Sequence, residues 1–474
     1  MTFQRDLAWQ QIEHSYRASV AHQCARYALA LNYSLLPENV VHQAKRCVLD
    51  ALGCAIGAYE APGRTICEAT VKEIGGPREA TVFCSGLRTS ALNASLVNSL
   101  LVRFLDCNDW GGGGHNSDAL ASVLAVTERE KVSGKDFLTS LVISYELGAR
   151  FAHSVTDGAL AGWSTDVRAG LNQPPALGKL MGLNEEQMAN AIGICMSHAL
   201  TLEILDCDRE EAVMAKNLRF GWVAHDAILA CMLAKKGFTG PVRIVESDDV
   251  GIRKVIAHGE MDLERLTDFS GWRMLDVGFK TIPANGGSQA HILCTLGIVK
   301  EQNLKPDDIA AVHIRASMHE SSHTTTASKK YPRHGESADH SAFYGNAIAI
   351  KEGVVNADSL KPEKFTDPVV LDLIEKITVA GDPGFSNYQG VSEIITKDGR
   401  RFQKRIDVLH GRADDPLTDK ELEQKFGGMA SKYMGETQIK KIFDICWNAE
   451  KLDDLAQLTR LMVFPRSGSP AATK

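Results

Sequence analysis

Apolar residues recur every three or four positions through about the first 270 residues of the chain. One such stripe consists of Ala18, Ala21, Ala25, Ala28 and Leu31. Comparable stripes occupy residues 40–56, 119–127 and 136–151, and this spacing predicts amphipathic helices. The stripes are rich in small residues, which allow helices to approach one another closely. The pattern therefore predicts a tightly packed helical core.

The pattern changes after about residue 272. Residues 309–317 alternate as a strand does, and residues 391–396 and 401–408 form a hairpin around an Asp-Gly turn. Helices over 286–300 and 338–352 and a strand over 377–381 complete this segment. The spacing Thr418-x-x-Glu421 then predicts a capped helix and a return to helical structure up to about residue 462.

These segments together predict a mainly α fold, with a large all-helical domain and an inserted smaller α/β lid domain. The helical domain is formed by residues 1–272 and 410–466, the lid by residues 273–409, and residues 467–474 form a disordered tail rich in Ser, Pro and Ala. A chain that leaves a helical domain and returns to it places a cleft between the two domains. Ligand sites favour such clefts.

Composition narrows the classes of function. The chain has 474 residues, of which 44% are hydrophobic and 23% charged, as in ordinary globular proteins. A net charge of −7 and an isoelectric point near 6.1 argue against nucleic acid as the main partner. No apolar run reaches the ~20 residues that span a bilayer, so no membrane partner is expected.

The cysteines and the N-terminus point to the cytoplasm. Eleven cysteines occur singly, with no C-x-x-C pair, which predicts reduced core thiols rather than a zinc ribbon or a redox dithiol. The first residues carry acids and no apolar core, so we expect no signal peptide.

The stretch Arg103–Asp118, R-F-L-D-C-N-D-W-G-G-G-G-H-N-S-D, concentrates chemistry-bearing residues between two helices. It contains Asp106, Asn108, Asp109, His115 and Asp118 around four consecutive glycines. Such glycines occur where the backbone turns sharply or approaches a ligand, and His with carboxylates moves protons. The alternative is a solvated loop with Asx turns. The acids and His115 could bind a metal by residue type, but their spacing matches no recognised site, so we predict none.

Four other groups are candidate site residues. Lys216 and Arg219 lie one turn apart near the start of a helix. The helix dipole disfavours cations there, so the pair could serve to bind an anion. The alternative is a solvated pair. Lys280 precedes a Gly-Gly helix start and could help to bind an anion, or be a surface lysine at a hinge. The last two groups, each of which could simply cap a helix, are Asp339-His340-Ser341 with Tyr344, and Asp166 after Trp163.

At these residues the chain resembles the 2-methylcitrate dehydratase family, the MmgE/PrpD group, which also includes cis-aconitate decarboxylases and iminodisuccinate epimerases. The resemblance covers about residues 20–460. It is carried by L-D-C-N-D-W and G-H-N-S-D within 105–118, M-A-K at 214–216, G-F-T-G-P at 237–241, F-K-T-I-P-A at 279–284, S-A-D-H-S-x-x-Y at 337–344 and P-L-T-D-K-E-L-E-Q-K-F at 416–426. It implies a helical domain built from both chain ends, an α/β lid, a site between them that needs no cofactor, and a homodimer.

With these residues, the resemblance implies a dehydratase that removes water from a 2-methylcitrate-like hydroxy tricarboxylate. Substrate carboxylates would meet Lys216, Arg219 and Lys280, with Asn108 and Asp166 as further substrate-binding residues. His115, held in its tautomer by Asp109 or Asp106, would be the principal acid/base, and His340 or Tyr344 would protonate the departing hydroxide; these two roles could be exchanged. The alternatives are a cis-aconitate decarboxylase, an epimerase of a dicarboxylate, and a binding protein that only retains the fold.

The chain also departs from the family pattern at the expected site. Asn116 stands where the family has Pro, and Trp110 stands where it has Thr. The decarboxylase branch tends to carry a histidine near residues 164–166, where this chain has Ser, Thr and Asp. We therefore expect the dehydratase branch, with substrate selection altered around the glycines.

Overall fold

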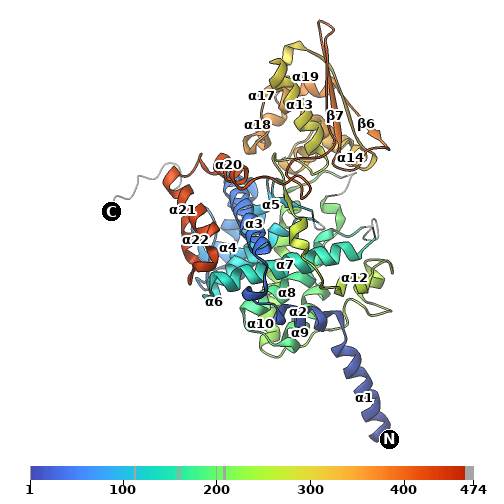
Figure 1. The fold of residues 1–474 in the computed structure, drawn as a ribbon, viewed down its shortest axis with the longest axis vertical. Helices are drawn as coiled ribbons and strands as arrows, with labels where there is room; N and C mark the ends of the chain where they lie inside the picture. Colours follow the sequence, from blue (N-terminus) through green and yellow to red (C-terminus); the bar gives the residue numbers. More distant parts are fainter. Residues whose placement is uncertain are drawn as a thin grey trace.

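The computed structural model describes residues 2–111, 114–156, 160, 162–198, 200–206 and 210–464, with side chains from residue 9 onward. Figure 1 shows an elongated molecule in which a helical part lies below a smaller part containing a β-sheet, and α1 projects from the lower end. Two of the four glycines after Trp110, and the tail predicted to be disordered, lie outside the described residues.

The helical part is built from small-residue helices that bury most of their surface. In α7, α8 and α10 the Ala, Gly and Leu positions are nearly all inaccessible, and α5, α6, α7, α8 and α10 pack on one another. The α-helices here are α1 (Thr2–Arg17), α2 (Val20–Ala30), α3 (Glu38–Gly57), α4 (Pro62–Ile74), α5 (Ala91–Arg103), α6 (Ala119–Glu130), α7 (Gly134–Ser154), α8 (Ala169–Leu180), α9 (Glu185–His198), α10 (Arg219–Lys235), α11 (Ile252–Val255) and α12 (Leu263–Thr267). Short 3-10 turns are η1 (Tyr33–Leu35), η2 (Asn116–Asp118), η3 (Thr165–Arg168), η4 (Glu203–Leu205), η5 (Met214–Leu218) and η6 (Arg273–Asp276).

Two small antiparallel ladders interrupt the helices, so this part is not purely helical. In the first, β1 (Ala80–Thr81) pairs with β2 (Arg88–Thr89). In the second, β3 (Asp109–Trp110) pairs with β4 (Gly278–Phe279), with Asp109 opposite Phe279. The second ladder joins segments about 170 residues apart in the chain and delivers the residue after Phe279, which is Lys280, to the segment that contains Asp106.

The smaller part contains a four-stranded mixed sheet in the order β6-β5-β7-β8. Its strands are β5 (Ile309–Ser317), β6 (Ile377–Asp382), β7 (Gly390–Thr396) and β8 (Arg401–Ile406). Strand β5 is parallel to β6 and antiparallel to β7, and β7 and β8 form the predicted hairpin. The helices α13 (Ser288–Gln302) and α17 (Ala342–Glu352) pack against each other and against the sheet. The predicted fold class, mainly α with a small α/β unit, is confirmed.

Shorter helices connect these elements. They are η7 (Pro306–Asp308), α14 (Met318–Thr324), α15 (Ala327–Lys330), α16 (Gly335–Ala338), η8 (Ala357–Leu360), α18 (Pro362–Phe365) and α19 (Pro368–Glu375). Helix α14 follows β5 directly; its N-cap Ser317 accepts a hydrogen bond from the backbone N–H of Glu320.

After the hairpin the chain returns to the helical part. The helices are α20 (Asp419–Ala430), α21 (Glu436–Trp447) and α22 (Ala456–Leu461), with the turn η9 (Ala449–Lys451). Thr418 and Glu421 cap α20 reciprocally, as predicted, and α20 and α21 pack on α3. The domain limits at residues 273 and 409 stay a prediction. Among the described residues, no helix combines the length and the apolarity needed to cross a bilayer.

Candidate active site

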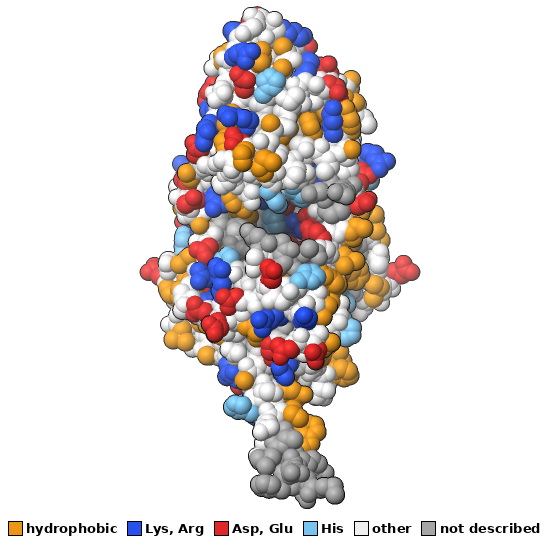
Figure 2. Space-filling model, turned by 90° about the vertical axis from the view of Figure 1, so that its right-hand side faces the viewer, with side chains coloured by type: hydrophobic (Ala, Val, Ile, Leu, Met, Phe, Trp, Pro, Cys, Tyr) orange, Lys and Arg blue, Asp and Glu red, His pale blue; other side chains and the backbone are white. Residues whose placement is uncertain are grey.

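A cavity of about 810 Å³ receives side chains from both parts of the molecule. Figure 2 shows a hollow at mid-height in which histidine, cationic and acidic side chains gather. The lining residues that the following paragraphs use are Arg103, Asp106, Trp110, Gly111, Gly114, His115, Asp206, Arg219, Lys280, His319, Glu320, His323 and His340. Of the predicted site residues, His115, Asp106, His340, Arg219 and Lys280 reach this cavity.

The backbone between α5 and α6 adopts conformations that need its unusual composition. Asp106, three residues after the end of α5, has a φ of 44°, in the left-handed region. Gly111 and Gly114 have φ values of 91° and 125°. A Cβ at Gly111 would lie 2.9 Å from the carbonyl oxygen of Asp276, and one at Gly114 would lie 2.8 Å from the guanidinium of Arg168. Glycine is therefore favoured at both positions by backbone conformation, and at Gly111 also by the space that the neighbouring backbone leaves.

Asp106 is the centre of a buried charge cluster. Its carboxylate lies 3.0 Å from Nζ of Lys280, 3.4 Å from the guanidinium of Arg103 and 3.4 Å from Nε2 of His115. The carbonyl oxygen of Asp106 also accepts a hydrogen bond from Lys280 at 2.7 Å. Burial opposes ionisation, but Lys280, Arg103 and Lys216 outweigh it and hold the pKa of Asp106 well below its usual value. Asp106 is therefore an anion that fixes its cations around the cavity.

His115 presents a defined nitrogen to the cavity. Its Nδ1 lies 2.6 Å from the carbonyl oxygen of Asp109. Because a carbonyl only accepts, Nδ1 carries the proton, and Nε2 of the neutral ring has a free lone pair facing Asp106. Burial, with the nearby Arg103 and Lys280, lowers the pKa of His115 well below its usual value. The ring is thus neutral at physiological pH and able to accept a proton at Nε2.

Asp109 and Asn108 lie behind the cavity rather than in it. The Asp109 carboxylate accepts from the backbone N–H and the hydroxyl of Ser117, at 3.1 and 2.5 Å. Burial raises the pKa of Asp109 to about 6. The Asn108 amide donates to Ser117 and to Asp118, at 2.9 and 3.1 Å. Both side chains shape the loop that carries His115, and it is the Asp109 backbone that orients this histidine.

His340 belongs to a second buried cluster. Its Nδ1 lies 2.5 Å from Oδ1 of Asp339 and 2.9 Å from Nζ of Lys216. Lys216 also donates to both oxygens of Asp339, at 3.1 and 3.3 Å. On the other side of the ring, Nε2 lies 3.6 Å from Oδ1 of Asp206. Lys216 does not line the cavity. It lies behind His340, where its ammonium is paired with Asp339.

Tyr344 points away from the cavity. Its hydroxyl donates to the carbonyl oxygen of Ser359 at 2.5 Å, and its ring packs edge-on against Phe365. The cap of α17 is Ser341, whose hydroxyl accepts from the backbone N–H of Tyr344 at 2.9 Å. This geometry leaves His340 as the member of the 339–344 segment that faces the cavity.

Arg219 reaches the cavity between two carboxylates. Its Nε lies 3.0 Å from Asp166 and its Nη1 lies 3.2 Å from Asp206. Asp166 also lies 3.4 Å from Arg168, and despite burial its pKa is lowered by Arg219 and Arg168. Asp166 therefore holds the cation in place, and its carboxylate lies outside the cavity lining.

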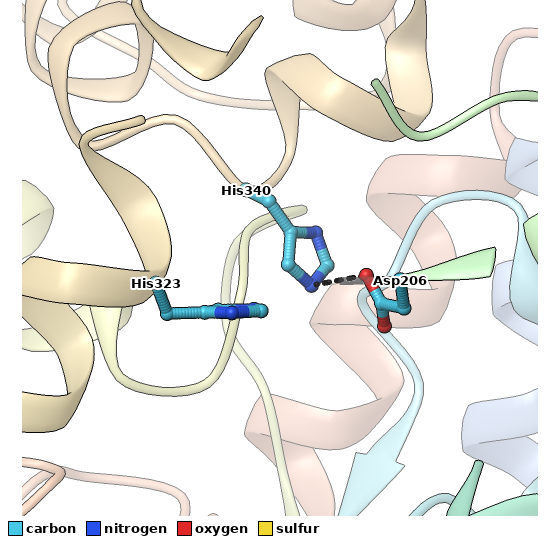
Figure 3. Close-up of side chains that lie close together, drawn as sticks. All are labelled: Asp206, His323 and His340. Carbon is cyan, nitrogen blue, oxygen red and sulfur yellow. Dashed lines mark ion pairs between the residues drawn. The ribbon is translucent and has the colours of Figure 1, made fainter. Parts of the chain in front are cut away.

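Sequence reasoning missed the acidic and histidine side chains on the opposite wall. His319, Glu320 and His323 come from α14, and Asp206 follows η4. Figure 3 shows His323 and Asp206 with His340. A signal was present, because residues 319–323 read H-E-S-S-H, an H-E-x-x-H spacing that places two histidines on one face of a helix. Asp206 had no comparable signal beyond its acidic surroundings.

Comparison with known protein families identifies the family of this chain. Residues 22–264 match the MmgE/PrpD N-terminal domain, and residues 282–449 match the MmgE/PrpD C-terminal domain. The chain belongs to the MmgE/PrpD family. Members of this family with a named activity include lyases that act on small tricarboxylates, in agreement with the resemblance read from the motifs.

Named relatives of this MmgE/PrpD protein are distant but nearly full-length. Cis-aconitate decarboxylase of Homo sapiens is 25% identical, over 96% of this chain and 97% of its own length. The mitochondrial 2-methylcitrate dehydratase of Yarrowia lipolytica is 26% identical, over 87% of this chain and 84% of its own. The 2-methylcitrate dehydratase of Escherichia coli strain K12 is 23% identical, over 90% and 93%. These identities do not separate decarboxylase from dehydratase.

Proposed function

We propose that this MmgE/PrpD protein is a dehydratase that removes water from a 2-methylcitrate-like hydroxy tricarboxylate to give a cis-aconitate-type product. The observation that carries the proposal is a pair of histidines on one cavity, each oriented through Nδ1 by a protein oxygen and each presenting Nε2. Dehydration needs both a base for the carbon-bound proton and an acid for the departing hydroxide. Decarboxylation needs only a proton donor.

His115 suits the role of base. Its Nε2 would take the proton from the carbon α to a carboxylate, and Asp106, 3.4 Å from this nitrogen, would stabilise the imidazolium that forms. Arg219 and Lys280, together with Arg103, would bind the substrate carboxylates and the negative charge that develops on them. The carboxylates already paired with these cations hold them in position, so little reorganisation accompanies binding.

His340 suits the role of acid. Asp339 and Asp206 lie at its two ring nitrogens, so a proton on either nitrogen would face a carboxylate. The electrons of the broken C–H bond form the carbon–carbon double bond as the C–O bond breaks. The hydroxide then leaves as water with the Nε2 proton of His340. Both histidines return to their starting protonation states when His115 releases its proton and His340 takes one up. Asn108 acts indirectly, through the loop that carries His115, and Asp166 acts through Arg219. The family resemblance further implies a homodimer.

A cis-aconitate decarboxylase is the second candidate. The observation that favours it is the near-complete coverage of this chain by the human cis-aconitate decarboxylase. The same cations would bind the substrate, and a histidine would protonate the carbanion left by CO₂. An epimerase would instead return the abstracted proton to the opposite face of the carbon.

One experiment separates these reactions. Purified protein, treated with chelator and dialysed, is incubated in D₂O with 2-methylcitrate, citrate or cis-aconitate, and the products are followed by NMR and by CO₂ release. We expect an alkene signal from 2-methylcitrate, which should form at least about a hundredfold more slowly with the His115→Ala variant. CO₂ from cis-aconitate would overturn dehydration in favour of decarboxylation, and deuterium incorporation without loss of water or CO₂ would indicate an epimerase.

The affinity for a polycarboxylate is expected to fall as pH rises through neutrality. Burial raises the pKa of Glu320, in the cavity wall, to about 7; Asp106 adds to this shift, whereas Ser288, Lys329 and Lys280 oppose it. Because the folded pKa is raised, Glu320 is protonated and neutral below pH 7 and becomes an anion above it. The added charge repels the substrate carboxylates, so KM should be several-fold higher at pH 8 than at pH 6.

The matched variant for this effect is Glu320→Gln. The amide keeps the shape and the hydrogen bond to Ser288, which is 2.5 Å from the carboxylate, but cannot ionise. We expect KM of this variant to be nearly independent of pH between 6 and 8. A pH dependence as steep as that of the parent would assign the effect to another group.

A further inference from the structure

Asp206, His323 and His340 converge at one end of the cavity. The two histidines come from the α/β part and Asp206 faces them from the helical part (Figure 3). One ligand-type atom from each of the three lies within 4.8 Å of the others. The rings of His323 and His340 meet edge to face, with centroids 5.3 Å apart. Two imidazoles and one carboxylate are a donor set that divalent transition metals prefer.

The orientation of His340 leaves the correct nitrogen available. A ring nitrogen 2.5 Å from a carboxylate oxygen needs a proton between the two atoms, because two facing lone pairs would repel. Nδ1 also lies 2.9 Å from the Lys216 ammonium, which can only donate, but its shorter contact is with Asp339, which can only accept, and this contact assigns Nδ1 as the donor. Lys216 donates to the same carboxylate. In the neutral ring, Nε2 then has a free lone pair directed at Asp206. A carboxylate that fixes a histidine through its other nitrogen is the usual support of a metal ligand.

Asp206 supplies a second, independent observation. Its Oδ2 is held by Arg219 at 3.2 Å, but its Oδ1 is buried and has no hydrogen-bond partner among the described residues. A buried carboxylate oxygen without a partner lowers the stability of the fold unless a bound ligand supplies the missing interaction. This oxygen lies 3.6 Å from Nε2 of His340. Tetrahedral zinc, with bonds of about 2.1 Å, separates its ligand atoms by roughly 3.4 Å. This pair therefore already has nearly the spacing of two zinc ligands.

We infer that Asp206, His323 and His340 bind one divalent cation of the zinc class, with the remaining coordination position open to the cavity. This differs from the expectation of a metal-free site and goes beyond the proposed function. His319 lies one turn before His323 in the H-E-S-S-H segment, with its ring 5.9 Å from that of His323. It falls outside the set of three, in which the two donors besides His323 are Asp206 and His340.

The consequence for the reaction is competition at one atom. A cation on Nε2 of His340 and a proton on the same nitrogen exclude each other, so metal binding should weaken as pH falls. The cation would take over the polarisation of a bound oxygen, which is chemistry that Lewis-acidic metals supply.

The test measures binding directly. Chelator-treated full-length protein is titrated with Zn²⁺ by calorimetry and with Co²⁺ by visible absorption, which reports nitrogen ligands and coordination geometry. We expect one ion per chain, a Co²⁺ spectrum typical of imidazole ligation, and affinity at least about tenfold lower in Asp206→Asn and in His323→Ala. His319→Ala and the exposed His313→Ala are the matched controls and should bind as the parent does.

Two outcomes would contradict the inference. No stoichiometric binding by the parent, at a pH where its circular dichroism is native, would overturn it and leave the proposed proton transfer intact. Equal loss in His319→Ala and His323→Ala, with none in Asp206→Asn, would assign the ion to the H-E-S-S-H helix alone. Conversely, if none of the substrates in the NMR assay is turned over, the proposed function is wrong, and the metal affinity is unaffected by that result.

Discussion

Replacing His115 with alanine is expected to lower kcat by roughly 10²- to 10⁴-fold, the range of a positioned acid or base. The reason is the fixed tautomer: the Asp109 carbonyl holds the proton on Nδ1, and burial with Arg103 and Lys280 keeps Nε2 unprotonated. Substrate carboxylates would still meet Arg219 and Lys280, so KM should change little. Steady-state kinetics on the substrate identified by NMR, with ligand-induced thermal stabilisation as a measure of binding, checks both parts.

His313→Ala is the matched control for this measurement. This histidine is exposed on β5 and hydrogen-bonds to Thr378 at 2.7 Å. Its removal should leave kcat unchanged. A His115→Ala variant that binds substrate and turns over as fast as the parent would remove His115 from the mechanism and leave His340 as the base to test.

The second large effect is on stability. Lys280→Met should lower the free energy of unfolding by about 3–5 kcal/mol, because it leaves a buried carboxylate with part of its compensation removed. Nζ of Lys280 lies 3.0 Å from the Asp106 carboxylate, and both side chains are almost fully buried. Denaturant unfolding followed by circular dichroism at constant pH measures the change.

A double variant shows whether the cost comes from the unpaired charge. Lys280→Met combined with Asp106→Asn removes both charges, and we expect it to be more stable than Lys280→Met alone. If the two changes simply add, the pair is not coupled and the loss reflects packing. The double variant should be inactive in either case, since both side chains line the cavity.

The sheet was predictable because its signals are local. The alternation over 309–317 gives β5 with the same limits, and the Asp-Gly turn gives the β7–β8 hairpin. Helix α14 was not predicted, although its seven residues carry His319, Glu320 and His323. Its apolar content is too low to give a helical stripe, and its helical state depends on the cap at Ser317 and on its contacts with the sheet.

The site was predictable where ionisable residues cluster along the chain and not where the fold gathers them. Asp106 and His115 are close in sequence. Lys280 is placed beside them by the β3–β4 ladder, which no local sequence pattern predicts. Asp206 meets His340 across more than 130 residues of chain. The side chains of Asn108 and Asp109 have the right residue types for a site, yet they turn into the protein to hold Ser117.

The buried pair between Lys216 and Asp339 crosses from the helical part to the α/β part. The cavity is complete only while the two parts are docked, and so the apparent affinity of any ligand includes the equilibrium between docked and separated forms. A substitution that loosens docking would lower affinity by the fraction of docked molecules that it removes, even if it touches no ligand atom. The affinity of this protein for its substrate can therefore change through residues far from the histidines.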